Sequence, residues 1–136
     1  MKTIILLICI NNLLVANSNY ELKLYEKIFS TIFQNIPIKI YGDKSSTILL
    51  KASNRFEIRK ICDENVDLII GKNFTNLSSI CKKKPLFATS YRWYKSQKNS
   101  FGTFYWRKGR PQIKFKKDSF KRFHLHLPQN LIKYAK

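Results

Sequence analysis

The side chains of this sequence that could carry out chemistry are few. His124 and His126 lie two residues apart, so on a strand they would share a face and could serve as ligands or bases. Neither has an obvious third partner, which favours a solvated pair over a metal or catalytic site. The sequence contains no CxxC, GxSxG or HExxH motif and no Gly-rich phosphate loop. We therefore expect no enzyme activity, no metal and no cofactor.

A basic, aromatic stretch over residues 101–115, FGTFYWRKGRPQIKF, permits two interpretations. Its rings and cations could stack the bases and hold the phosphates of single-stranded nucleic acid. Alternatively, residues 104–107 and 111–115 form a hairpin that turns at Lys108-Gly109. The rings alternate with charge as inward-facing side chains would; they are Phe101, Phe104, Trp106 and Phe115. We favour the structural hairpin and do not expect nucleic acid as a partner.

The turn of this hairpin would carry a basic rim. The candidate partner-binding residues there are Arg107, Lys108, Arg110 and Lys114. The chain as a whole carries a net charge of +18, from 26 Lys and Arg against 8 Asp and Glu. Such a charge favours anionic partners of any kind, including lipid head groups, acidic polymers and acidic protein surfaces. Because the lysines are spread along the whole chain, a bias in composition would produce the same charge with no function behind it.

The first 18 residues have the layout of a secretory signal. Lys2 precedes an apolar run from Ile4 to Ala16, and small polar residues follow. The run is short for a bilayer span, which needs about 20 apolar residues. We expect cleavage near Ala16 or Ser18, with an uncleaved tether as the alternative. The mature protein would then be a single domain over residues 19–136, periplasmic or secreted.

Export changes how Cys62 and Cys81 are interpreted. In an oxidising compartment the two thiols are expected to form a disulfide, with two buried free thiols as the alternative. The chain-entropy model gives such a loop a stabilisation of about 3 kcal/mol. A zinc site is not expected, since the histidines occupy one short stretch. These cysteines indicate a role in stability rather than catalysis.

The spacing of apolar residues predicts helices that alternate with strands. In the first half we expect an amphipathic helix over 20–36 and strands at 36–41 and 66–71. A short helix within 76–84, a strand over 86–93 and a polar loop over 94–100 are expected to follow. The hairpin comes next, and then a last helix capped by Asp118 or Ser119 before a Leu-rich tail. Residues 46–62 permit either a short helix capped by Ser46 or Thr47, or a strand over 47–50, with a helix through Phe56, Ile58 and Ile61 afterwards. The order predicts a single small α/β domain: a mainly parallel sheet flanked by helices, with a C-terminal antiparallel hairpin and a short terminal helix.

The second half of this order, residues 66–135, resembles the YfiR-like family of periplasmic proteins. VDLIIG looks like that family's buried strand, KPLFATSYRW is similar to its proline-introduced strand, and NSFGTFYWRKGRPQIKF is similar to its closing hairpin. A polar cap and a Leu-rich finish, here NLIKYA, follow in both. The chain departs from the family after Phe115, where Lys116 and Lys117 replace an acid and an Asn. The family's acidic contact therefore has no counterpart here.

The resemblance implies a non-catalytic regulator that binds the outward domain of an inner-membrane signalling protein, a diguanylate cyclase or a sensor kinase. A homodimer is left open. One alternative is a cationic exported protein that binds anionic polymer or lipid. Another is a domain that binds a small solute, because α/β sheets place such sites at the ends of their strands. The loops to consider would then contain Lys72, Asn73, Ser90 and Tyr91.

Overall fold

The computed structural model describes residues 18–136. The predicted secretory signal therefore lies outside the described residues except for Ser18. None of the helices within 18–136 combines the length and the apolar character needed to cross a membrane.

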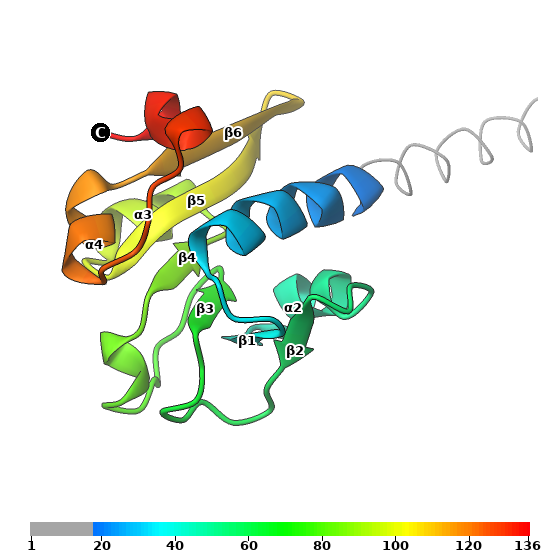
Figure 1. The fold of residues 1–136 in the computed structure, drawn as a ribbon, viewed down its shortest axis with the longest axis vertical. Helices are drawn as coiled ribbons and strands as arrows, with labels where there is room; N and C mark the ends of the chain where they lie inside the picture. The colour runs from blue at the N-terminus through cyan, green and yellow to red at the C-terminus, as the bar shows by residue number, and fades with distance from the viewer. Residues whose placement is uncertain (1–17) are drawn as a thin grey trace, which may run out of the picture.

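A six-stranded sheet forms the centre of the domain (Figure 1). The strands are β1 (Ile38–Gly42), β2 (Phe56–Ile58), β3 (Leu68–Gly71), β4 (Leu86–Ala88), β5 (Ser100–Arg107) and β6 (Arg110–Phe115). Their order across the sheet is β2-β1-β3-β4-β5-β6; neighbouring strands are parallel from β2 to β5, and β6 pairs with β5 antiparallel. The predicted fold class is confirmed.

Alternation along the strands divides the core into two layers. Ile38, Ile40, Leu68, Ile70 and Phe87 contribute to the layer that contains the first helix. Ile69, Leu86 and Ala88, which alternate with them, pack instead with Trp93 and Tyr94. Every residue of β3 is buried, which confirms the prediction that the run at 66–71 is buried on both faces.

The first helix covers one face of the sheet (Figure 1), and its described part spans residues 18–32. Tyr25, Ile28, Phe29 and Ile32 are buried at helical spacing. The Phe29 ring lies edge-on to Phe87 of β4, with 5.0 Å between ring centres. Each such side chain contributes about 1.5–3 kcal/mol on burial. The helix ends at residue 32, four residues earlier than the predicted end at 36. Pro37 lies farther along the chain and restricts the conformation of Ile36 alone.

The structure decides between the arrangements open for residues 46–62. A helix, α2 (Lys44–Leu50), does form there, but its cap is Asp43 rather than Ser46 or Thr47. The helix predicted through Phe56 and Ile61 is wrong, because Phe56–Ile58 is the edge strand β2, parallel to β1. Phe56 is buried within β2, whereas Ile61 lies beyond the end of the strand and is 74% exposed.

Two further boundaries differ from the prediction. The strand expected over 86–93 ends at Ala88, and Tyr91–Ser96 is a helix, α3, whose cap Ser90 accepts a hydrogen bond from the Trp93 N–H at 3.2 Å. The last helix, α4 (Lys117–Arg122), begins after Lys116 rather than at Asp118 or Ser119. Ser119 is buried and its hydroxyl donates to the Ser100 carbonyl at 3.1 Å, so it ties α4 to β5. Two 3-10 turns, η1 (Cys81–Lys83) and η2 (Gln129–Tyr134), complete the chain.

Candidate functional site

A cavity of about 480 Å³ lies where β1, β3 and β4 end at their carboxyl termini. The chain runs from β1 to β2 on one side and then returns to β3 on the other, so the connections diverge between β1 and β3. Open α/β sheets bind ligands at this kind of crevice. The lining residues are Glu21, Tyr25, Ser45, Ser46, Leu49, Lys72, Thr89, Ser90, Tyr91, Phe104, Tyr105 and Trp106.

Asp43 fixes the loops on either side of this crevice. Its Oδ1 accepts the Ser46 N–H at 3.0 Å, which caps α2, and its Oδ2 accepts the Lys72 N–H at 2.7 Å, which holds the loop after β3. Burial raises the pKa of Asp43, but hydrogen bonds from Ser46, Lys72 and Ser45 outweigh that effect and hold the pKa below its ordinary value. The ionised carboxylate is therefore a structural anchor of the cavity.

Aromatic side chains form one wall of the cavity. Phe104 lies edge-on to Tyr25, with 5.7 Å between ring centres, and the same separation joins Phe104 to Trp106. Tyr91 and Tyr105 form a second pair at 5.2 Å. Burial, reinforced by the charges of Glu21 and Asp43, raises the pKa of Tyr25 far above its ordinary value, so its hydroxyl stays neutral. The wall offers apolar faces with neutral hydroxyl groups.

Lys72 and Glu21 are the charged side chains among the lining residues. The Glu21 Oε1 accepts a hydrogen bond from the Trp106 indole N–H, so this carboxylate also orients the indole. Within residues 18–136 no group of three or more His, Cys, Asp and Glu side chains could hold a metal ion. The chemistry of the cavity is suited to holding a small molecule through ring faces, hydroxyl groups and one charge of each sign.

The structure brings together three of the four residues predicted for ligand loops. Lys72, Ser90 and Tyr91 line the cavity, whereas Asn73 is exposed and is not part of the lining. The Ser90 hydroxyl donates to the Lys72 carbonyl at 3.3 Å, which joins the two loops. The sequence interpretation missed Glu21 and Tyr25, because a helix start far away in sequence gave no sign that it would lie beside these loops.

The predicted basic rim does not form one patch. Arg107, Lys108 and Arg110 are exposed at the tip of the hairpin. Lys114 lies farther along β6, half-buried, with its Nζ 4.7 Å from the centre of the Tyr91 ring. The hairpin tip thus carries three of the four predicted residues, and Lys114 belongs to the side that faces α3.

The hairpin is confirmed, but one of its four rings is exposed instead of buried. Phe101, Phe104 and Phe115 are buried, as predicted, while Trp106 is 39% exposed. Beyond Thr103, β5 pairs with β6 but no longer with β4. Trp106 therefore lies at the margin of the core, with 5.7 Å between its ring centre and that of Phe104 and 6.1 Å to that of the exposed Tyr20. The prediction that Trp106 is a core residue is therefore wrong.

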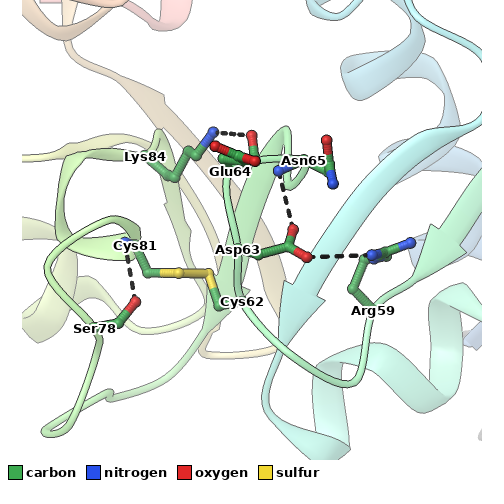
Figure 2. The surroundings of a disulfide bond; sticks show 8 residues. All are labelled: Arg59, Cys62, Asp63, Glu64, Asn65, Ser78, Cys81 and Lys84. Carbon is green, nitrogen blue, oxygen red and sulfur yellow. Dashed lines mark hydrogen bonds and ion pairs between the residues drawn. A yellow bond between two sulfur atoms is a disulfide. The ribbon is translucent and has the colours of Figure 1, made fainter.

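The disulfide between Cys62 and Cys81 is present, with 6.1 Å between the Cα atoms. Figure 2 shows the hydrogen bonds that order the chain around it, among them Cys81 N–H to the Ser78 hydroxyl at 3.3 Å and Lys84 Nζ to the Glu64 carbonyl at 2.7 Å. Cys62 precedes β3 and Cys81 precedes β4, so the bond lies at the amino edge of the sheet. It is remote from the cavity at the opposite edge.

The sequence matches no protein-family model and no curated protein. A conserved domain protein from Vibrio cholerae, solved by crystallography, has a similar fold, with a TM-score of 0.61 at 11% sequence identity. The similarity covers 85% of this chain and 59% of that chain. At such low identity it shows the fold alone, and this chain spans little more than half the length of that protein.

Proposed function

We propose that this protein acts outside the cytoplasm as a non-catalytic regulator of the YfiR-like kind. It binds the outward domain of an inner-membrane signalling protein, a diguanylate cyclase or a sensor kinase. Its effect on that receptor equals the difference in its affinity for the receptor's two states. The Cys62–Cys81 disulfide is compatible with an oxidising, exported location.

The observation that carries the proposal is the exposed indole at the hairpin tip. Trp106 is 39% exposed and its neighbours Arg107 and Arg110 are exposed as well. Trp and Arg are the residue types most enriched among those that dominate binding energy at protein interfaces. Glu21 and Tyr20 hold the indole in place, which lowers the entropic cost of docking it.

The charge of the tip indicates the kind of partner. Arg107, Lys108 and Arg110 are exposed, and none of them takes part in a salt bridge within residues 18–136. An acidic surface on the partner would complement them and speed association. The apolar indole at the centre would keep the complex together at high ionic strength, where charge alone is screened.

Crosslinking in cells that export the tagged protein tests this proposal, followed by a high-salt wash and mass spectrometry. We expect recovery of one membrane sensor, cyclase or kinase, lost in Trp106→Ala and retained in Ile61→Ala. Ile61 is a matched control because it is 74% exposed and follows β2, the outer strand at the side of the sheet opposite to β6. Equal recovery with both variants would refute the role of the hairpin tip. Capture of only anionic polymer or lipid at low salt would favour the cationic-binder alternative.

A second candidate function, binding of a small solute, is favoured by the cavity at the carboxyl edge. Its volume of about 480 Å³ lies within the range of small-molecule sites. Thermal unfolding in the presence of a solute collection tests it. A solute that raises the melting temperature of the wild type should do so less for Lys72→Gln, whereas Asn73→Ala, whose side chain is outside the lining, should respond fully. A solute that stabilises Lys72→Gln as much as the wild type would bind elsewhere.

A further inference from the structure

A second cavity, of about 370 Å³, lies along the outer edge of β6 and gathers lysine side chains. Figure 1 shows the C-terminal turns beside β6, and Ala135 forms a bridge with Phe115 there. The Lys136 N–H donates to the Phe115 carbonyl at 3.1 Å, which fixes this wall. We name the cavity the lysine groove; its polar lining residues are Tyr91, Tyr94, Lys95, Lys114, Lys133, Tyr134 and Lys136.

Tyrosine rings position the ammonium groups of this groove. The Nζ atoms of Lys114 and Lys95 lie 4.7 and 5.5 Å from the centre of the Tyr91 ring. The Nζ of Lys133 lies 5.1 Å from the centre of the Tyr134 ring. Cations within about 6 Å of a ring centre are attracted to its face. Three cations are thus held on the walls of the groove.

The positive charge of the groove is not neutralised by neighbouring side chains. Among the described residues, 18–136, no aspartate or glutamate lines it. The three salt bridges found within residues 18–136 all involve Arg55 or Arg59, outside the groove. Two ammonium groups that share one ring repel each other, and an anion between them would relieve that repulsion. The electrostatics of the groove therefore favour an oxyanion.

The rest of the groove is apolar. Ile113 and Phe115 contribute to its lining, alongside the faces of Tyr91 and Tyr94. An inorganic anion would leave these surfaces in contact with water, whereas a ring would cover them and stack on the tyrosines. The volume of about 370 Å³ is that of a small-ligand site.

We propose that the lysine groove binds a small ligand in which an oxyanion, a phosphate or a carboxylate, is attached to an aromatic ring. The oxyanion lies among the ammonium groups of Lys95, Lys114 and Lys133, which all line the groove, and the ring packs against the tyrosine side chains. The site is separate from the hairpin tip and from the cavity at the carboxyl edge, except that Tyr91 borders both cavities. It does not depend on the proposed regulatory function.

Isothermal titration of residues 19–136 with phenyl phosphate tests the inference. We expect saturable one-to-one binding. Inorganic phosphate and phenol, which each supply one half of the probe, should bind at least about tenfold more weakly, a loss of about 1.4 kcal/mol each. Absence of saturable binding of phenyl phosphate would overturn the proposal. Equally tight binding of inorganic phosphate would overturn the role of the ring.

Variants locate the binding site. Lys114→Gln with Lys133→Gln should weaken phenyl phosphate binding at least about tenfold, since each substitution removes a charged hydrogen bond to the oxyanion. Lys114→Arg with Lys133→Arg should retain binding. The matched control, Lys51→Gln with Lys98→Gln, removes the same charge from exposed positions outside the groove and should change affinity less than about twofold. If the control variant bound phenyl phosphate as weakly as the groove variant, net charge alone would account for binding and the proposed site would be wrong.

Discussion

Single side chains fix the loops at the carboxyl edge of the sheet. Asp43 accepts hydrogen bonds from two loops, and each bond involves an ionised oxygen, which makes it stronger than a bond between neutral groups. Lys116 has a comparable role on the other side of the molecule. Its Nζ donates to the carbonyls of Tyr94 and Gln97 at 2.6 and 3.2 Å and so closes the end of α3.

We expect Asp43→Asn to lower the free energy of unfolding by about 1–2 kcal/mol near neutral pH, because the amide cannot satisfy both loops. The pKa of Asp43 is lower in the folded protein than its ordinary value of 3.8. Its contribution is therefore complete above that value and is lost as the pH falls through the folded pKa. Urea unfolding of wild type and variant should show a difference that shrinks in acid.

Glu64→Gln is the control for this measurement, since the Glu64 side chain is exposed. It should change the free energy of unfolding little at any pH. A difference between wild type and Asp43→Asn that stays constant, or grows, as the pH falls would contradict the anchoring role of the carboxylate.

At the scale of elements, the β5–β6 hairpin connects the core to the exposed tip. Its turn has two residues with positive φ, Lys108 at 51° and Gly109 at 74°. A two-residue turn of this kind matches the twist of the strands and prefers Asn-Gly. Deeper in the hairpin, a Cβ at Gly102 would lie 2.8 Å from the Phe115 ring, so the two strands pack closely enough to require glycine there.

Lys108→Asn should stabilise the hairpin by about 0.5 kcal/mol, because asparagine adopts positive φ at lower cost than lysine. The measurement is the midpoint of urea unfolding. Lys108→Ala is the matched control, since alanine loses the same charge without tolerating this conformation. A gain in stability for alanine as large as that for asparagine would assign the effect to charge instead of backbone conformation.

On the scale of the whole molecule, the two ends of the sheet carry different features. The amino edge is closed by the Cys62–Cys81 disulfide, while the carboxyl edge carries the cavity and the exposed hairpin tip. The chain as a whole has a net charge of +18. This separation predicts that the stability of the fold can be lowered at one edge without altering binding at the other.

Replacing both Cys62 and Cys81 by alanine should lower the free energy of unfolding by about 3 kcal/mol, the value expected for a loop of this length. Urea unfolding measures it, and dithiothreitol should reproduce the loss in the wild type and leave the variant unchanged. At urea concentrations below its unfolding midpoint, the variant should still capture the partner recovered with the wild type. An unchanged unfolding midpoint would contradict the structural role of the disulfide.

Sequence patterns correctly predicted the α/β class, the first helix, the buried strand β3, the hairpin and the pairing of Cys62 with Cys81. These features depend on local periodicity, on turn residues and on the positions of the three cysteines, of which Cys9 lies in the expected secretory signal. Short elements were harder to predict. The helix expected through Phe56 and Ile61 proved to be a strand because pairing with β1 stabilises it, and such pairing is not visible in the local sequence.

Contacts between side chains that are distant in sequence could be identified from the folded structure alone. Glu21 of the first helix contacts Trp106 of β5, 85 residues away in sequence, and together they border the cavity with Lys72 and Ser90. Lysines from α3, β6 and the C-terminal turn converge in the same way on the lysine groove. Parallel strands bring their carboxyl ends to one edge of the sheet, so the loops that follow them form the cavity there. Which loops are neighbours depends on the strand order, and the local sequence does not specify that order.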